Sequence, residues 1–180
     1  MEAMFIPYKS ARTGLKSMSN NIVLIGFMGS GKTTIGREVA KLKQSVLFDT
    51  DSIIEANCGM SINEIFGTFG EAHFRELEVH LCEFIRKNVH NAIIATGGGM
   101  PVNYDLRELG SVFYLKAPIE VLNGRVREDT SHTRPLFSRF DLANELYKRR
   151  IYHYEKQADF TLNALDSITQ IAQRICDANL

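Results

Sequence analysis

The sequence predicts an α/β fold in which a parallel β-sheet is covered by helices on both faces. Short apolar runs alternate along the chain with longer stretches of helical periodicity, which is typical of parallel strands joined by crossover helices. Clusters of glycine or aspartate directly follow three of the apolar runs. With 180 residues, of which 44% are hydrophobic, the chain is long enough to form one domain with a full core.

The first elements are an apolar run at residues 21–25, a glycine-rich loop at residues 26–34 and a helical stretch at residues 34–43. The apolar run predicts a buried parallel strand. The loop matches the phosphate-binding pattern G-x-x-x-x-G-K-[ST] at four fixed positions, which are Gly26, Gly31, Lys32 and Thr33. This motif requires a preceding strand and a following helix, and both are predicted, so we expect the chain to bind a nucleoside triphosphate.

The chemistry of phosphate binding explains the residue types in this loop. Glycines let backbone N–H groups close around phosphate oxygens, and the N-terminus of the following helix adds partial positive charge. Lys32 is expected to reach the β- and γ-phosphates, and the Thr33 hydroxyl is expected to coordinate Mg²⁺. The residues expected to contact the nucleotide here are Gly29, Ser30, Gly31, Lys32, Thr33 and Thr34.

The alternation continues to the end of the chain. Strands are predicted at residues 46–49, 92–96, 112–115 and 160–163, and helices at residues 61–69, 71–87, 118–126, 142–157 and 167–178. Ser61 and Glu64 have the spacing of a capping box, which marks a helix start. In the helix at 71–87 the apolar stripe predicts five buried side chains, which are Phe74, Leu77, Leu81, Phe84 and Ile85.

Two segments fall outside this pattern of strands and helices. Residues 127–140 are polar and contain Pro135, which predicts a loop. Residues 1–19 precede the first strand and are expected to be a weakly ordered extension of a single domain at residues 20–180.

Charge and cysteine content narrow the classes of partner and compartment. Lys+Arg and Asp+Glu both number 21, so the net charge of zero does not favour nucleic acid or an anionic membrane as a partner. No apolar stretch reaches the roughly 18 residues of a transmembrane helix. The three widely spaced cysteines match neither a disulfide framework nor a zinc site, so we expect a reducing, cytoplasmic environment.

Asp49 and Asp51 follow the predicted strand at 46–49 and have two possible roles. They could form a turn and a helix cap, which is common for aspartate. Beside a phosphate-binding loop, the two aspartates could instead have separate roles in phosphoryl transfer. Asp49 would then face Mg²⁺ and the phosphates, while Asp51 would accept hydrogen bonds, and a proton, from a substrate hydroxyl.

Two further features also have two interpretations. Gly97, Gly98 and Gly99 could form a flexible turn, or could let a small ligand lie directly against the backbone. Arg75 has Glu71 four residues before it and Glu78 three residues after it. This spacing is typical of a solvated helix ion pair, but the two acids could also hold Arg75 in one rotamer for an anionic substrate group.

Together these motifs resemble the shikimate kinase family. The resemblance runs through residues 21–160, and its order is more specific than the phosphate-binding loop alone. The segments that carry it are Gly26–Thr33, Gly36-Arg37, Phe48–Asp51, Ile65-Phe66, Phe74-Arg75 with Glu78, Gly97–Gly99, Arg134–Leu136, and Arg150 ahead of Tyr154.

The resemblance implies a P-loop NTPase fold of three layers, similar to the nucleoside monophosphate kinases. Its five-stranded parallel sheet would have the order 2-3-1-4-5, with helices on both faces and a mobile lid. It also implies ATP-dependent phosphorylation of the 3-hydroxyl of shikimate, in the route to chorismate and the aromatic amino acids. Similar enzymes are commonly monomeric, so a monomer acting on this small molecule is expected.

The resemblance also implies roles for individual residues. Asp51 would bind the substrate hydroxyls and act as base, while Arg75, Arg150 and the backbone of Gly97, Gly98 and Gly99 would hold the carboxylate. Lys32 and a lid residue, Arg134, would contact the transferring phosphoryl group. Arg127 would lie against adenine, and Thr33 and Asp49 would organise Mg²⁺.

Two other classes stay open at this point. Another small-molecule kinase of the same fold, such as a gluconate or nucleoside monophosphate kinase, would share the phosphate-binding loop. A P-loop switch domain would bind nucleotide without an acceptor, but it leaves the arginines at positions 75, 134 and 150 unexplained.

Overall fold

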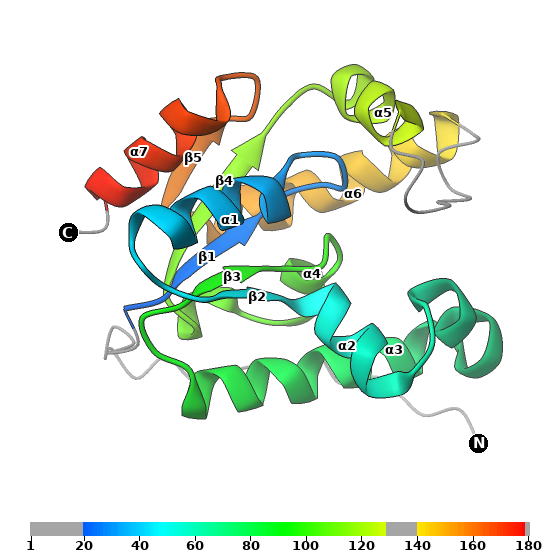
Figure 1. Cartoon of the computed structure of the whole chain (residues 1–180). Coiled ribbons are helices and arrows are strands. Elements are labelled where there is room, and N and C mark those ends of the chain that lie inside the picture. The colour runs from blue at the N-terminus through cyan, green and yellow to red at the C-terminus, as the bar shows by residue number, and fades with distance from the viewer. Residues whose placement is uncertain (1–19, 129–139, 179–180) are drawn as a thin grey trace.

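The computed structural model describes residues 20–128 and 140–178, which form a parallel sheet with helices packed against it (Figure 1). The strands are β1 (Ile22–Ile25), β2 (Leu47–Asp49), β3 (Ile93–Ala95), β4 (Ser111–Lys116) and β5 (Phe160–Asn163). The helices are α1 (Lys32–Leu42), α2 (Thr50–Cys58), α3 (Ile62–Asn88), α4 (Met100–Asn103), α5 (Ile119–Glu128), α6 (Phe140–Gln157) and α7 (Ile168–Ala178), with a 3₁₀ helix at Leu106–Glu108.

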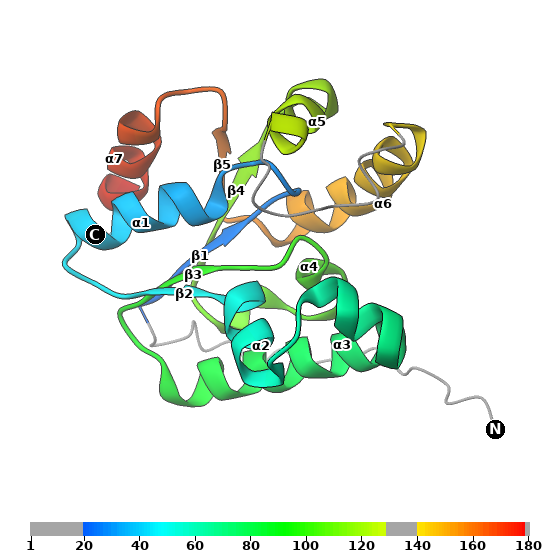
Figure 2. The same ribbon diagram turned by 45° about the vertical axis from the view of Figure 1, so that its right-hand side comes forward.

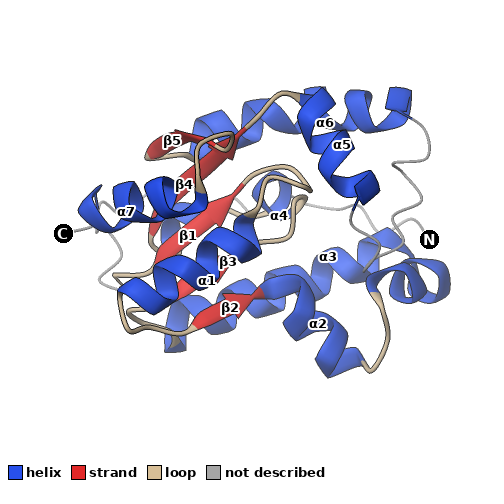
Figure 3. Cartoon of the chain, turned by 45° about the horizontal axis from the view of Figure 1, so that its top comes forward, coloured by secondary structure: helices blue, strands red, loops and turns tan. Residues whose placement is uncertain are grey.

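The sheet has the order β2-β3-β1-β4-β5, and every neighbouring pair is parallel. Figure 3 shows α1 and α7 in front of the sheet, and α3, α4 and α6 behind it. The predicted three-layer fold and its strand order are therefore confirmed. β1 and all but the two ends of β4 are fully buried, as expected for central strands that have helices on both faces.

The strand register brings the carboxyl ends of β1, β2 and β3 to one edge of the sheet. Ala95 at the end of β3 pairs with Asp49 at the end of β2 and with Leu24 near the end of β1. The chain segments that follow these strands consequently start side by side. Figure 2 shows α5 on one side of this edge, and α2 with the first turns of α3 on the other.

The region between β2 and the long helix differs from the prediction. Residues 50–58 form α2, which the sequence analysis did not predict, and Asp49 caps this helix by accepting a hydrogen bond from Ser52 N at 3.2 Å. The capping box at the start of α3 is confirmed, since Ser61 N donates to Glu64 Oε2 at 2.7 Å and Glu64 N donates to Ser61 Oγ at 3.3 Å. The two helices predicted at 61–69 and 71–87 are joined as α3, with a kink at Gly70 (φ 84°, ψ 169°).

The predicted buried stripe of α3 is only partly correct. Phe74 and Ile85 are buried, but Phe84 is 56% exposed. The buried face also includes two charged residues, Arg75 and Glu78. At about 100° per residue, Phe84 points roughly 130° away from the centre of that face. The error arose because the stripe was located from apolar residues alone, whereas a polar pair occupies part of the buried face.

Three of the predicted features lie outside the described residues. They are the extension at residues 1–19, most of the loop at 127–140, and Arg134 with the lid on which it was placed. Within residues 20–128 and 140–178, no helix is long and apolar enough to cross a membrane.

Asn21 lies just before β1 and holds the segments that precede β3 and β4, the two strands on either side of β1, at the edge opposite the carboxyl ends. Its fully buried side chain donates from Nδ2 to Val89 O and Leu109 O, each at 2.9 Å, and its Oδ1 accepts from Ala92 N at 2.9 Å. All five polar atoms in this set belong to buried residues, so each depends on the others for a hydrogen-bond partner.

Replacing this amide should destabilise the protein. We expect Asn21→Ala to lower the free energy of unfolding by about 3 kcal/mol, because each hydrogen bond contributes about 1 kcal/mol net. Urea denaturation measures the change. The control is Asn88→Ala, which removes one exposed amide hydrogen bond to Phe84 O. Equal denaturation midpoints for the two variants would contradict the stabilising role of Asn21.

Candidate functional site

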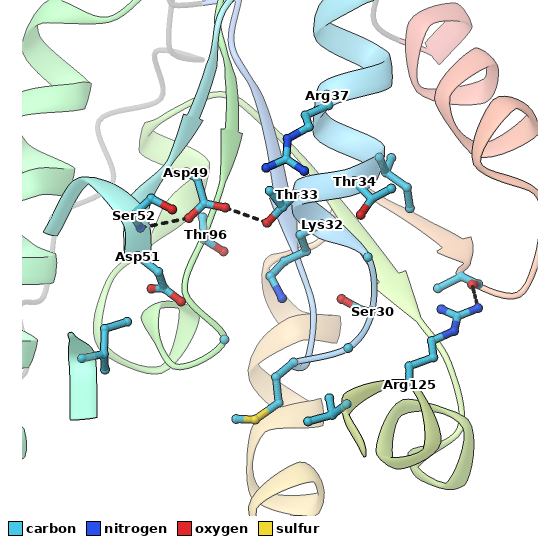
Figure 4. Close-up of a pocket in the computed structure, with 18 of the residues that line it drawn as sticks. Ser30, Lys32, Thr33, Thr34, Arg37, Asp49, Asp51, Ser52, Thr96 and Arg125 are labelled. Carbon is cyan, nitrogen blue, oxygen red and sulfur yellow. Dashed lines mark hydrogen bonds between the residues drawn. The ribbon is translucent and has the colours of Figure 1, made fainter. Parts of the chain in front are cut away.

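A cavity of about 1040 Å³ opens at the carboxyl edge of the sheet. Its wall includes the glycine loop after β1, the start of α2, the first turn of α3, the last turns of α5 and the loop after β5. Figure 4 shows Lys32 and Asp51 pointing into the space between the glycine loop and α2. One cavity therefore exposes both the phosphate-binding loop and a separate acidic group, as a nucleotide and an acceptor bound side by side would require.

The glycine loop presents a cation and a buried hydroxyl. The Lys32 ammonium donates to the carbonyl oxygens of Gly26 at 2.8 Å and Phe27 at 3.0 Å, which holds it above the loop from which it comes. Within the described residues, the buried Ser30 hydroxyl has no hydrogen-bond partner. A polar atom left in this state is costly, and a phosphate oxygen is a suitable partner for it. The loop therefore fits the phosphates of a nucleotide.

Thr33 and Asp49 are the candidates for holding Mg²⁺. The Thr33 hydroxyl donates to Asp49 Oδ2 at 2.6 Å, so two oxygen ligands of the type that Mg²⁺ prefers lie together beside the glycine loop (Figure 4). The described residues contain no group of three His, Cys, Asp or Glu side chains that could hold a metal ion without other ligands. This set fits Mg²⁺ that is also held by phosphates and water, which is the usual arrangement in kinases.

Asp49 and Asp51 have different environments. Asp49 caps α2 and also accepts from Thr33, so the cap interpretation and the metal-side interpretation both describe its position. Asp51 lies in the first turn of α2 and faces the cavity. The start of this helix separates the two carboxylates.

The three glycines after β3 are required for different reasons. A Cβ at Gly97 would lie 2.5 Å from Asp51 Oδ1, and a Cβ at Gly99 would lie 2.6 Å from Arg75 Nη1. These two positions are glycine because the protein's own charged side chains pack against the backbone. Gly98 differs, because a Cβ there would have ordinary contacts only, the nearest being Arg150 Nη1 at 3.5 Å. Gly98 also lines the cavity, which is consistent with the interpretation that a small ligand lies directly against the backbone at this position.

Arg75 is held in one orientation by two acids. It is 9% exposed, and Glu78 is 2% exposed. Arg75 Nη1 donates to Glu78 Oε2 at 2.7 Å, and Nη2 donates to Glu71 Oε1 at 2.6 Å. The guanidinium also lies over the rings of Phe66 and Phe74, at 5.9 and 5.3 Å from their centroids. This is not a solvated surface ion pair, so the alternative in which the acids fix the rotamer describes it better.

Burial and charge act in opposite directions on this pair. Burial alone would lower the pKa of Arg75, but the Glu78 and Glu71 carboxylates outweigh it and the pKa lies above its ordinary value. For Glu78, burial raises the pKa, with Asp51 adding to the effect and Arg75 and Arg150 opposing it. Glu78 Oε1 is buried and has no hydrogen-bond partner in the described part of the chain.

Arg150, rather than the adjacent Arg149, faces the site. Arg149 is exposed, whereas Arg150 is partly buried beside Gly98 and over the Phe27 ring, 6.0 Å from its centroid. Burial lowers the pKa of Arg150, and Arg75 acts in the same direction, while Tyr154 and Glu78 oppose them. Two guanidinium groups from α3 and α6 are therefore brought near the same triple glycine.

The far end of the cavity contains a residue that the sequence analysis missed. Arg125 lines the wall there, and its Nη2 donates to Ala164 O in the loop after β5 at 3.0 Å. Arg127 is exposed and the described cavity wall does not include it. The placement of Arg127 against adenine therefore stays a prediction, as does the role of Arg134. No sequence signal separated Arg125 from the other arginines of α5, because its partner is a backbone carbonyl of a distant loop.

Comparison with known proteins identifies the family. The family model described as shikimate kinase matches residues 28–179 of the chain.

The chain belongs to the shikimate kinase family. A shikimate kinase from Helicobacter hepaticus is 50% identical over 157 residues, covering 87% of this chain and 94% of that protein. One from Clostridium botulinum is 44% identical over 142 residues, covering 76% of this chain and 83% of its own length. As a member of a kinase family, the chain is an ATP-using phosphotransferase.

Solved structures agree with this family. Shikimate kinase from Acinetobacter baumannii in complex with shikimate superposes with a TM-score of 0.78 at 31% identity, covering 90% of this chain and 93% of that one. The enzyme from Bacteroides thetaiotaomicron gives a TM-score of 0.79 at 31% identity, covering 88% and 97%. A deoxyadenosine kinase from M. mycoides, at 18% identity and a TM-score of 0.60, and covering 88% and 97%, shares the fold alone.

The raised pKa of Glu78 predicts a specific pH dependence of stability in this shikimate kinase family member. The folded state holds the Glu78 proton more tightly than the unfolded state does, so this contribution is present at low pH and is lost as pH rises through the folded pKa. We therefore expect the free energy of unfolding of the wild type, minus that of Glu78→Gln, to fall between about pH 4 and 8.

Urea denaturation at a series of pH values measures this difference. Glu71→Gln is the matched control, because it removes a carboxylate from the same arginine at a side chain that is 68% exposed. A difference between wild type and Glu78→Gln that rises with pH would show that Arg75, and not burial, dominates the titration of Glu78.

Proposed function

We propose that this chain transfers the γ-phosphoryl group of ATP to the 3-hydroxyl of shikimate. The observation that carries the proposal is the placement of Arg150 beside Gly98 and of Arg75 beside Gly99, next to a cavity whose wall includes Gly98, Asp51 and the phosphate-binding loop. An acceptor with one carboxylate and a ring of hydroxyls matches this arrangement. A structural relative of the same family is described in complex with shikimate, which supports the choice.

In this proposal the two arginines bind the carboxylate of the acceptor. Hydrogen bonds between guanidinium and carboxylate are charge-assisted, and the planar guanidinium fixes the orientation of the acid as well as its position. Glu71 and Glu78 keep Arg75 in its rotamer before the acid arrives, so little side-chain freedom is lost on binding. The acid is thereby anchored away from the glycine loop, with its hydroxyls turned toward Asp51.

Asp51 would orient the reacting hydroxyl and accept its proton. Its carboxylate is anchored at the start of α2 and packs against Gly97, so it faces the acceptor from a rigid element. Lys32, the loop N–H groups and, from outside the described residues, Arg134 would stabilise the charge on the transferring group. Mg²⁺ held by Thr33 with Asp49 would neutralise charge on the phosphates.

Two alternative functions are less well supported. A gluconokinase and the deoxyadenosine kinases share the fold at 14–18% identity. This likeness concerns the fold alone and does not indicate which acceptor the chain uses. A nucleotide switch without an acceptor would have no use for a buried arginine fixed by two acids opposite the phosphate loop.

An acceptor panel tests the proposal directly. ADP release is measured with ATP and Mg²⁺ in the presence of shikimate, gluconate, AMP or no acceptor, and we expect turnover with shikimate alone. ADP release that is slow and indifferent to the acceptor would favour the switch. Turnover with AMP or gluconate would assign the carboxylate pocket to another acid or to a phosphate.

Replacing Asp51 should separate catalysis from nucleotide binding. We expect Asp51→Asn to lower kcat by about 10²–10⁴-fold, because a positioned general base contributes that much to proton transfer. ATP affinity, measured by calorimetry with a non-hydrolysable analogue, should stay close to that of the wild type. Asp141→Asn is the matched control, since Asp141 is an exposed aspartate in the first turn of α6. Loss of ATP affinity with retained kcat would move Asp51 to the nucleotide side.

A further inference from the structure

We propose that Tyr154 is a positioning residue for the acceptor carboxylate, whose hydroxyl links the Gly98 carbonyl to Arg150 and so fixes both at once. The inference rests on the proposed function, because it assigns the residue that organises the carboxylate pocket. Tyr154 lies on α6, and its hydroxyl donates to Gly98 O at 2.6 Å. Its ring is fully buried and packs against Tyr114, with the ring centroids 5.2 Å apart.

The Arg150 guanidinium lies beside the same segment, with Nη1 3.5 Å from the position that a Cβ on Gly98 would take, and its positive charge acts against burial on the pKa of the Tyr154 hydroxyl. A guanidinium only donates hydrogen bonds and a carbonyl only accepts them, so an atom that links the two must do both. A phenol hydroxyl has this dual capacity. One Tyr154 hydroxyl can therefore connect the arginine of α6 with the glycine segment after β3, which are the two elements proposed to hold the acid from opposite sides.

Holding the Gly98 carbonyl toward Tyr154 has an electrostatic consequence. A carbonyl oxygen turned toward the acceptor would repel its carboxylate, and the hydrogen bond from Tyr154 keeps it turned away. The described residues contain no cis peptide bond, so the N–H of Gly99 points the opposite way from the Gly98 carbonyl. Burial raises the pKa of the Tyr154 hydroxyl, which consequently stays protonated and able to donate over the whole working pH range.

The hydrogen bonds of Gln157 make it possible to distinguish a positioning role of Tyr154 from a merely structural one. It lies one turn further along the same face of α6, where its Nε2 donates to Pro101 O and Tyr104 O and its Oε1 accepts from Leu106 N at 2.8 Å. Gln157 therefore anchors the chain that follows the glycines without help from Tyr154. Removing the Tyr154 hydroxyl should loosen Gly98 and Arg150 while the fold around α4 is retained.

The variant Tyr154→Phe tests the proposal, with Tyr147→Phe as its matched control. Tyr147 also lies on α6, and its hydroxyl also donates to a backbone carbonyl, that of Ala117 at 3.1 Å, away from the glycine segment. We expect Tyr154→Phe to raise KM for shikimate about 10-fold, because a hydrogen-bonded charge contact loses its geometry. KM for ATP and kcat should change less than about 2-fold. Tyr147→Phe should change none of the three.

A double-mutant cycle shows whether Tyr154 acts through Arg150. Arg150→Gln is combined with Tyr154→Phe, and we expect the double variant to have nearly the KM of Arg150→Gln alone, because the two losses are one interaction. Multiplied effects on KM would overturn the proposal. So would a Tyr154→Phe variant with the shikimate KM of the wild type, or one in which kcat and both KM values change together.

An NMR measurement on the wild-type protein needs no variant. The buried Tyr154 hydroxyl proton should give a signal that saturating shikimate shifts and saturating ATP leaves in place. A signal that shikimate does not move would overturn the proposal even if Tyr154→Phe failed to fold. The acceptor panel on the wild type is run first. Lack of turnover with shikimate there counts against the proposed function, whereas normal turnover with an unmoved signal counts against Tyr154 alone.

Discussion

Parallel pairing of β1, β2 and β3 is the constraint on which the site depends. Because the three strands run in the same direction, the segments after them must open at one edge of the sheet. That edge receives the glycine loop, the Asp49–Asp51 segment and the triple glycine, which are far apart along the chain. The packing of Asp51 on Gly97 joins the segments after the neighbouring strands β2 and β3. The hydrogen bond from Thr33 to Asp49 joins the segment after β1 to the end of β2, on the other side of β3.

The balance of charge at this edge follows from that convergence. Arg75 and Glu78 are buried there and Arg150 is partly buried, which costs desolvation energy for each group unless partners compensate. The Glu78 carboxylate compensates the charge of Arg75 through an ion pair, and Tyr154 opposes the lowering of the Arg150 pKa by burial. Glu78 Oε1, however, has no hydrogen-bond partner among the described residues. A buried charged cluster of this kind often stabilises a fold less than well-packed apolar side chains of similar volume would. It suits the proposed acceptor pocket, which would be cationic on the side where an acid binds and acidic where a hydroxyl loses its proton.

The sequence predicted those features whose cause is local. The phosphate-binding loop and the capping box at Ser61 depend on neighbouring residues, and they agree with the structure. The strand order, which also agrees, is not local and was implied by the family resemblance. α2 was missed because Asp49 ends a strand and caps a helix at the same residue. A helix cap was considered there, but no helix was assigned to the residues that follow. Phe84 was placed inside because helical periodicity cannot show that a charged pair occupies the buried face. Arg125 was missed, and Tyr154 was named without a role, because their partners are carbonyls of loops that sequence spacing does not relate to them.

The triple glycine illustrates how one motif can have separate physical causes. Gly97 and Gly99 are small because Asp51 and Arg75 pack against their backbone, so their absence of a side chain serves the protein's own charges. Gly98 has room for a methyl group among protein atoms, yet its carbonyl accepts a hydrogen bond from the Tyr154 hydroxyl, and Arg150 lies beside it. A run of glycines at this position is therefore not a flexible turn. Its two outer members let charged side chains close in, and its middle member leaves backbone exposed in the cavity, where the proposed acceptor would lie.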